Sequence, residues 1–199
     1  ENEIQSKEFI NLIEDNDLLE LSELDRYKLI KHRLEHSDIR RINDVKGNIN
    51  YWEESYSGKG IFPPKGSGLI EEDLLENRWN NLLTAIHTTG EITKKNTHLP
   101  DLEGEFYFSG KNLILIEIGS LKYKTLMNGW LNHLYLSANS SFNSKTIIIS
   151  KKTNYSKNFN FEVTREILPI NTQEATKTIS EINLIAAEGI KNCWPIPPE

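Results

Sequence analysis

The chain has 199 residues, of which 37% are hydrophobic and 26% are charged, and this balance supplies a folded core and argues against wholesale disorder. The net charge of −6 argues against a broad basic face, so any contact with nucleic acid has to be local or be made by neighbouring subunits. The single cysteine, Cys193, excludes an intrachain disulfide and fits a reducing compartment.

The N-terminal part of the chain is predicted to be helical. Residues 6–20 permit a helix, and Ser22, three residues before Asp25, indicates the start of a second one. Ser37 is expected to cap a short third helix that ends at Gly47. The second helix is expected to bury one stripe of side chains, namely Leu24, Tyr27 and Leu34.

A loop and a strongly amphipathic helix follow. Residues 55–68 are rich in glycine and proline, which break regular structure, so they are predicted to form a loop. Residues 69–87 carry apolar side chains at helical spacing and predict a helix with one buried face. That face consists of Leu75, Trp79, Leu82, Leu83 and Ile86.

Beyond Pro100 the spacing of apolar residues becomes that of strands. Residues 102–108 and 112–118 predict a hairpin around a tight turn at 109–112. The second strand of this hairpin is nearly all apolar, which is typical of a central strand. A helix is predicted over residues 121–138.

Two more strands and a helix complete the chain. Residues 145–150 predict a third strand, and residues 159–167 alternate between polar and apolar and predict a half-exposed fourth strand. Thr172 opens a long final helix that is predicted to end near Asn192. Its buried stripe is predicted to consist of Ala175, Ile179, Ile182 and Ala186.

The order of these elements predicts an α/β fold in layers, with a central mixed sheet flanked by helices. We expect one domain, in which residues 1–50 form a helical segment and residues 51–199 form the α/β core. The chain starts without Met and ends at WPIPPE, so we expect a fragment of a longer protein. No signal-peptide pattern and no apolar run near the roughly 20 residues of a membrane-spanning helix are present, so we expect a cytoplasmic location without membrane contact.

Acidic residues on the hairpin are the first candidates for chemistry. Glu105 lies on its first strand and Glu117 lies at the end of its second strand. The hairpin and the helix after it resemble the core of PD-(D/E)XK nucleases, which implies a restriction-endonuclease-like fold. In that core two carboxylates hold magnesium through oxygen, and a lysine two residues after the second carboxylate orients the attacking water. Gly119 stands at the lysine position, so we predict a degenerate site with no catalytic residue, no metal and no cofactor.

A basic segment after the third strand is the second candidate. Lysines interleaved with aromatic rings are suited to contact single-stranded DNA by charge and stacking. The candidates for DNA contact are Lys151, Lys152, Tyr155 and Lys157. A solvated hairpin is the alternative, and it is the favoured one. His32 and His36 share a helix face, but no further zinc ligand accompanies them, so a surface role is favoured for both.

Three segments carry a resemblance to a known family. Residues 21–34 contain a Leu-Asp-Arg-Tyr core that opens a helix, and the glycine-rich loop at 57–68 leads into an acidic helix. The strongest landmark is SLKYKTLMNGWLNHLYLSA at residues 120–138, with the pairs Trp130-Leu131 and His133-Leu134.

These landmarks, with Glu188-Gly189 in the final helix, resemble the C-terminal domain of RecC, the gamma subunit of exodeoxyribonuclease V, over roughly residues 18–199. The resemblance implies an inactivated nuclease-like domain that works with a RecB-like helicase–nuclease and a RecD-like helicase. Such a complex processes double-strand DNA ends for recombinational repair in bacteria. The predicted function is therefore that of a non-catalytic domain of an ATP-dependent exodeoxyribonuclease, which supports subunit assembly and guides DNA strands.

Two other hypotheses stay open. The retained carboxylates also fit an active metal-dependent nuclease that uses Glu105, Glu117 and Lys122. The net charge of −6 also fits a protein-interaction domain that is unrelated to DNA.

Overall fold

A computed structural model gives the fold of the chain. It describes residues 20–37, 42, 51–56, 61–63, 66–99, 102–139, 142–152 and 159–192. The helices predicted at 6–20 and 37–47 lie almost wholly outside these residues. None of the described helices is long and apolar enough to cross a membrane.

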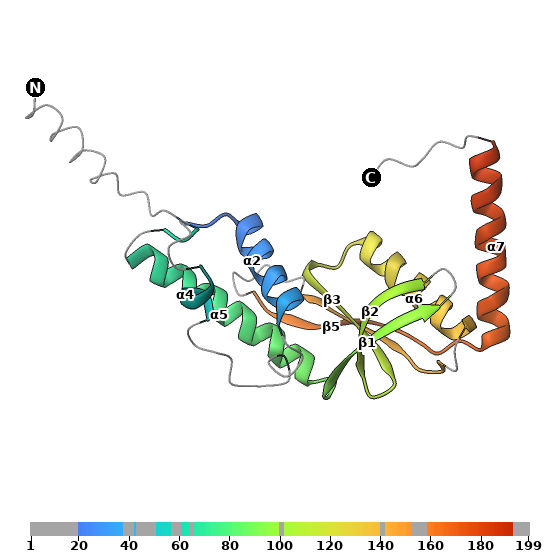
Figure 1. The fold of residues 1–199 in the computed structure, drawn as a ribbon, viewed down its shortest axis with the longest axis horizontal. Coiled ribbons are helices and arrows are strands. Elements are labelled where there is room, and N and C mark those ends of the chain that lie inside the picture. The colour runs from blue at the N-terminus through green and yellow to red at the C-terminus, as the bar shows by residue number, and fades with distance from the viewer. Residues whose placement is uncertain are drawn as a thin grey trace, which may run out of the picture.

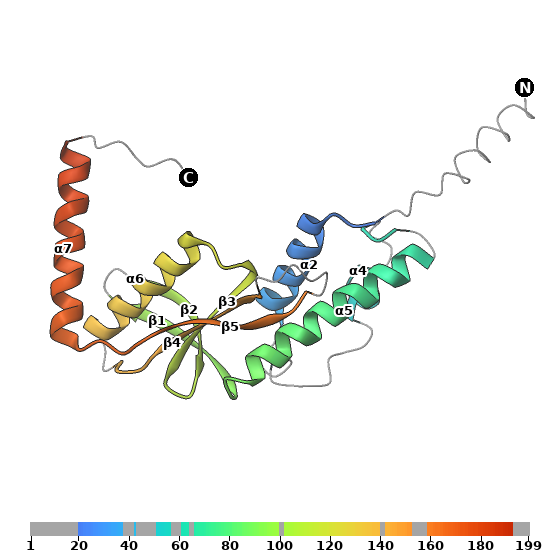
Figure 2. The same ribbon diagram turned by 180° about the vertical axis from the view of Figure 1, so that it is seen from behind.

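Five helices and five strands are named across Figures 1 and 2. The helices are α2 (Glu23–His36), α4 (Tyr51–Tyr56), α5 (Gly66–His87), α6 (Tyr123–Asn139) and α7 (Thr172–Lys191). The strands are β1 (Ile92–Leu99), β2 (Leu102–Ser109), β3 (Asn112–Ser120), β4 (Thr146–Lys151) and β5 (Phe161–Ile167).

The strands form one mixed sheet in the order β1-β2-β3-β4-β5. The β3–β4 pair is parallel and is connected through α6, whereas the other neighbours are antiparallel. Figures 1 and 2 show α6 across one face of the sheet, with α2 and α5 toward one end of the molecule and α7 at the opposite end. The prediction of an α/β layered fold with a mixed sheet flanked by helices is confirmed, and β3 is the central strand as expected.

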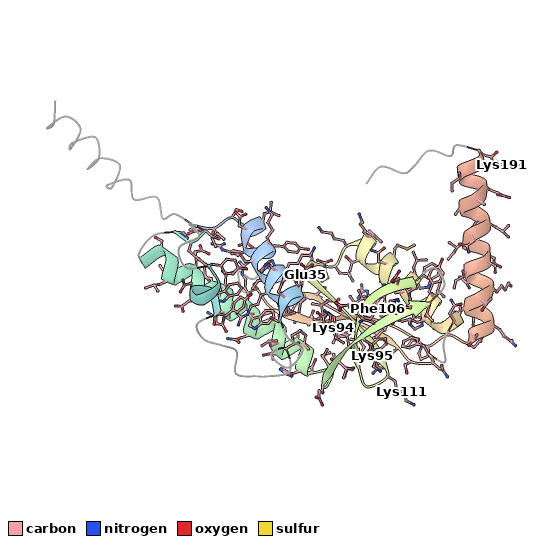
Figure 3. The ribbon with its side chains drawn as sticks, viewed as in Figure 1. Glu35, Lys94, Lys95, Phe106, Lys111 and Lys191 are labelled. Carbon is pink, nitrogen blue, oxygen red and sulfur yellow. The ribbon has the colours of Figure 1, made fainter. Side chains whose placement is uncertain are left out.

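The strand β1 was missing from the sequence-based prediction. Its sequence, ITKKNTHL, is mostly polar and exposed because β1 is an edge strand that pairs with β2 along its whole length. Lys94 and Lys95 project from it, and the Nζ of Lys95 lies 5.2 Å from the ring centroid of Phe108 (Figure 3). Charged side chains of this kind are the common protection of an edge strand against unwanted pairing.

The predicted loop at 55–68 is shorter than expected at both ends. Helix α4 continues through Tyr56 and helix α5 already begins at Gly66. A Cβ atom at Gly68 would lie 2.4 Å from the carbonyl oxygen of Pro63, so only glycine lets the preceding chain approach α5 this closely. The predicted apolar face of α5 is confirmed, since all five of its residues are buried.

Helix α2 begins as predicted but buries a different face. The Ser22 hydroxyl accepts a hydrogen bond from the Asp25 backbone N–H at 3.1 Å, as an N-cap does. Leu34 is buried, but Leu24 is 60% exposed and was wrongly predicted to be buried. The reason is that two arginines share the buried face of α2, which consists of Arg26, Leu29, Ile30, Arg33 and Leu34.

Buried ion pairs attach α2 to α5. The Arg26 Nε donates to Glu71 Oε2 at 2.8 Å and its Nη2 donates to Glu71 Oε1 at 2.5 Å, which is a bidentate pair. The hydrogen bonds from Arg26 lower the pKa of the Glu71 carboxyl. The Leu21 backbone N–H donates to the same carboxylate at 3.1 Å, so its acceptor positions are well used.

A second arginine holds α4 in place. The Arg33 guanidinium donates to Glu76 at 2.7 Å and lies over the rings of Tyr51, Trp52 and Trp79. The indole N–H of Trp52 donates to the same Glu76 carboxylate at 2.8 Å. Cation–π contacts and shared hydrogen bonds thus allow a guanidinium to be buried inside the apolar cluster.

Helix α6 packs closely on the sheet. A Cβ atom at Gly129 would lie 2.8 Å from the end of the Leu115 side chain, so any larger residue there would force Leu115 to shift where α6 crosses β3. His133 is buried on the same helix and its Nδ1 lies 2.8 Å from the Thr146 hydroxyl of β4. Burial lowers the pKa of His133, which favours the neutral ring.

Helix α7 departs from its prediction in packing but not in position. Asn171 caps its start by accepting the Glu174 backbone N–H at 2.8 Å. Of the predicted stripe only Ala175 is buried, and Ala186 is exposed. The helix extends away from the sheet toward Lys191 (Figure 3), so apolar residues of its second half stay uncovered. They include Leu184, Ile185 and Ile190.

We predict that Glu71→Leu lowers the free energy of unfolding by about 3 kcal/mol, because it leaves the Arg26 guanidinium buried without its main partner. Equilibrium unfolding in urea at neutral pH measures this loss. The folded-state pKa of Glu71 is lowered from its ordinary value of 4.5, so the pair stabilises the fold above that pH and loses its effect as the pH falls. The gap between the natural chain and the variant should therefore narrow below about pH 4.5.

The matched control is Lys28→Met, which removes an exposed ion pair to Asp25 at 3.7 Å on the same helix. This change is expected to cost less than about 0.5 kcal/mol. Equal losses in the two variants would contradict the structural role given to Arg26 and Glu71.

Candidate functional site

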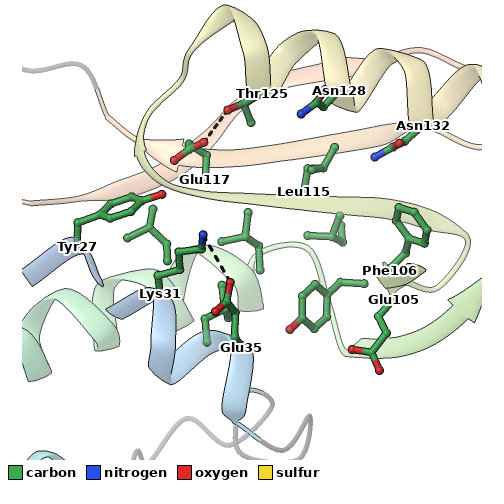
Figure 4. Close-up of a pocket in the computed structure, with 15 residues that line it drawn as sticks. Tyr27, Lys31, Glu35, Glu105, Phe106, Leu115, Glu117, Thr125, Asn128 and Asn132 are labelled. Atoms are coloured by element: carbon green, nitrogen blue, oxygen red, sulfur yellow. Dashed lines mark hydrogen bonds and ion pairs between the residues drawn. The ribbon is translucent and has the colours of Figure 1, made fainter. Parts of the chain in front are cut away.

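A cavity of about 400 Å³ opens where β2 and β3 separate. The two strands pair only from Ser109–Asn112 to Tyr107–Ile114, although both continue well beyond these residues. Strand β2 stays paired with β1 and strand β3 stays paired with β4, so the sheet divides at this point. Helix α2 lines one side of the opening and α6 lines the other (Figure 4).

Glu117 lies on the α6 side of this cavity. Its Oε2 accepts the Thr125 hydroxyl at 2.6 Å and its Oε1 accepts the Gly119 backbone N–H at 3.1 Å. Among the described residues no lysine, arginine or histidine forms an ion pair with it. Glu117 is therefore oriented by two neutral donors and keeps an unneutralised carboxylate at the cavity.

Glu105 also lines the cavity but does not meet Glu117. Figure 4 shows the two carboxylates at opposite ends of the cavity and pointing apart. Glu105 is engaged in an ion pair with Lys94 of the neighbouring strand, and its hydrogen bond raises the pKa of Lys94. Within the part of the chain that the structure describes, no three histidine, cysteine or acidic side chains gather as metal ligands would.

Gly119 follows Glu117 at the position that a catalytic lysine would take. A Cβ atom built at Gly119 would lie 3.5 Å from Glu117 Oε1 and 3.9 Å from Tyr27 Cε2, which are ordinary contact distances. The glycine is thus not forced by crowding, and the local fold has room for a side chain.

Helix α2 contributes residues that sequence reasoning did not connect with the site. Lys31 extends from α2 toward β3 and its Nζ lies 3.6 Å from Glu35, one helical turn away (Figure 4). Tyr107 of β2 lies across from them, and burial raises the pKa of its phenol. The polar face of α2 was visible in the sequence. Its contact with β3 is a long-range one, which residue spacing cannot predict.

Of the lysines proposed for DNA contact, Lys151 and Lys152 lie at a different place, the C-terminal end of β4. Lys151 projects its Nζ 4.1 Å from the ring centroid of Phe159, and Lys152 pairs with Glu162 at 3.1 Å. Tyr155 and Lys157 lie outside the described residues, so their positions stay predictions.

Two further lysines lie near the C-terminal ends of β3 and β4. Ser120 at the end of β3 pairs in register with Lys151, and Lys122 and Lys124 follow it at the start of α6. Both are exposed, and no described acidic side chain forms an ion pair with either of them. Lys122, Lys124 and Lys151 therefore all lie near the C-terminal ends of the neighbouring parallel strands β3 and β4, while the Lys151 side chain itself lies over Phe159.

His32 and His36 make local contacts at the end of α2. Their rings stack at 4.1 Å, and the Nδ1 of His32 lies 2.9 Å from the Tyr56 hydroxyl. The Nδ1 of His36 lies 2.9 Å from the His32 carbonyl oxygen. Both rings are thus used in local contacts at the end of α2.

The family model described as the RecC C-terminal domain matches residues 3–199. A search of curated proteins gives no match.

We predict that Gly119→Lys folds with a free energy of unfolding within about 1 kcal/mol of the natural chain, because the site has room for the side chain and glycine weakens a strand interior. Urea unfolding measures this. Gly129→Lys is the contrasting variant, since its side chain would collide with Leu115, and it is expected to cost several-fold more. A Gly119→Lys chain that fails to fold would show that the glycine is structurally required.

Proposed function

Because this chain belongs to the RecC C-terminal domain family, which is part of the RecBCD exodeoxyribonuclease complex, we propose that it is a non-catalytic domain that supports subunit assembly and guides DNA strands. It acts with RecB-like and RecD-like subunits in the cytoplasm while double-strand breaks are processed. The family match over residues 3–199 is the observation that carries this proposal.

The absence of catalysis is supported by the arrangement of the nuclease-like positions. Metal-dependent phosphodiester cleavage needs carboxylates that converge on one cation and a cationic group near the attacking water. Glu105 pairs with Lys94 and points away from Glu117, and Gly119 supplies no charge. The rival hypothesis of an active nuclease needs Lys122 to fill this role, but Lys122 lies beyond the end of β3 and does not line the cavity.

Strand guidance is supported by three lysines, Lys122, Lys124 and Lys151, that lie near the C-terminal ends of β3 and β4. Exposed ammonium groups attract phosphates without reading the base sequence. A small basic group on an acidic chain fits a local contact with DNA whose other side is bound by a neighbouring subunit.

Subunit assembly is supported by the uncovered half of α7. Ile190 is 82% exposed and Leu184 and Ile185 lie on the same part of the helix. Large exposed apolar residues that lie close together along one helix favour a protein interaction surface, whereas single scattered ones need no explanation.

We predict that the subunit purified without its partners does not cleave linear duplex or single-stranded DNA in the presence of magnesium or manganese. Gly119→Lys should remain inactive as well, because restoring the lysine does not bring Glu105 to Glu117. Gel analysis of end-labelled DNA measures this. Metal-dependent cleavage that disappears in Glu117→Ala would overturn the non-catalytic assignment.

We predict that replacing Lys122, Lys124 and Lys151 by glutamine weakens the binding of DNA ends by the assembled complex. A plot of the logarithm of the binding constant against the logarithm of the salt concentration should also become less steep, by about one for each phosphate that the lysines no longer neutralise. Fluorescence anisotropy over a range of salt concentrations measures both effects.

The matched control replaces Lys95, Lys111 and Lys177, which lie elsewhere on the surface, with the same change in net charge. Equal effects from the two triple variants would mean that the net charge of the chain, and not the position of Lys122, Lys124 and Lys151, controls DNA binding.

A further inference from the structure

The open edge of β3 exposes backbone groups of an inner strand. The two-residue turn makes Ser109 and Asn112 a hydrogen-bonded pair, and such pairs alternate along an antiparallel ladder, so Tyr107 and Ile114 form the next one. By the same alternation Ile116 directs its N–H and C=O toward the side that β2 has left. An unpaired N–H and C=O of this kind is a template for another strand.

The two faces beside this edge differ in chemistry. On the α2 face, Tyr107 and Ile116 are half-buried and pack against the main apolar cluster. On the α6 face, Glu117 is accompanied by Asn128 and Asn132. Since side chains of a strand alternate between faces, an added strand would place every second residue against apolar groups and the others against a carboxylate and amides.

The charge of the cavity lining favours a peptide over nucleic acid as the ligand. The cavity lining holds three glutamates and one lysine. Lys94 pairs with Glu105 and Lys31 pairs with Glu35, which leaves Glu117 without a described cationic partner. A lysine or arginine side chain complements this carboxylate, whereas a phosphate would be repelled by it.

We propose that the β3 edge at Leu115–Glu117 binds an extended segment of a partner protein as an additional strand, and that this segment alternates apolar residues with lysine or arginine. The apolar residues contact Tyr107 and Ile116, a basic residue pairs with Glu117, and the backbone pairs with Ile116. This inference goes beyond the function proposed above and depends on none of its DNA contacts.

The test uses the complete polypeptide and a fluorescent peptide of alternating lysine and valine as the probe. Anisotropy measures binding, and hydrogen exchange followed by mass spectrometry measures the protection of residues 112–120. We expect saturable binding together with slower exchange in that segment. A peptide of alternating glutamate and valine should bind at least about tenfold more weakly, because its charge has the wrong sign.

Variants assign the contacts. Glu117→Gln should weaken binding of the lysine–valine peptide about tenfold because it removes a charge-assisted hydrogen bond. Glu103→Gln makes the same charge change at an exposed position of β2 outside the cavity lining and should leave affinity unchanged. A lysine–valine peptide with N-methyl groups on alternate amides keeps its side chains but cannot pair with β3, and it should not bind.

Four results would overturn the proposal. They are no binding of the lysine–valine peptide, equal binding of the N-methylated peptide, equal weakening in Glu103→Gln and Glu117→Gln, and protection of residues 112–120 by oligothymidylate in place of the peptide. The last result would assign the cavity to nucleic acid. Failure of the complex to bind DNA would bear on the proposed function alone, so the two can fail separately.

Discussion

The buried pairing of Arg26 with Glu71 is the interaction on which the candidate site depends. It joins α2 to α5 across 45 residues of sequence, and α5 is in turn fixed against β5 and the apolar cluster. Helix α2 makes its own contact with β3, so its position decides how the opening between β2 and β3 is bounded. A buried guanidinium needs its carboxylates in good geometry, and this requirement selects one orientation of α2 and thereby presents Lys31 and Glu35 to the cavity.

The cavity is lined by Glu105 and Glu117, but the two carboxylates lie at its opposite ends. The division of the sheet after Tyr107 and Ile114 follows from strong pairing on each side of it, β1 with β2 and β3 with β4. Glu105 is the partner of Lys94 on the edge strand β1, while Glu117 is oriented by Thr125. The first contact links β2 to the sheet edge, whereas Glu117 forms no ion pair with any described cationic residue.

The sequence was most informative where one local pattern decides the structure. The apolar spacing of α5, the hairpin turn between β2 and β3, the cap at Ser22 and the start of α7 at Thr172 follow from periodicity and capping chemistry, and the structure contains all of them. The errors arose where distant contacts decide. The buried face of α2 contains Arg26 and Arg33 and not Leu24, because Glu71 and Glu76 of α5 pair with these arginines. Strand β1 is polar because it is an edge strand, and the predicted apolar stripe of α7 is buried only at Ala175 by the described residues. Glu105 and Gly119 were found by their spacing, but the separation of Glu105 from Glu117 depends on how the sheet divides.

The two proposed surfaces lie on either side of the first turn of α6, and their opposite charges make them compatible. Thr125 faces the cavity and binds Glu117, whereas Lys122 and Lys124 precede it after the end of β3, the strand whose last residue pairs in register with Lys151. Under the two proposals, a DNA strand bound by the lysines would be repelled by the Glu117 carboxylate if it moved into the cavity, and this repulsion acts within a Debye length of about 8 Å. The proposed protein segment would then bind the β3 backbone without competition from DNA. The net charge of the whole chain does not reveal these two surfaces, because Lys122 and Lys124 lie near Lys151 in the sequence of strands of the sheet but not along the chain.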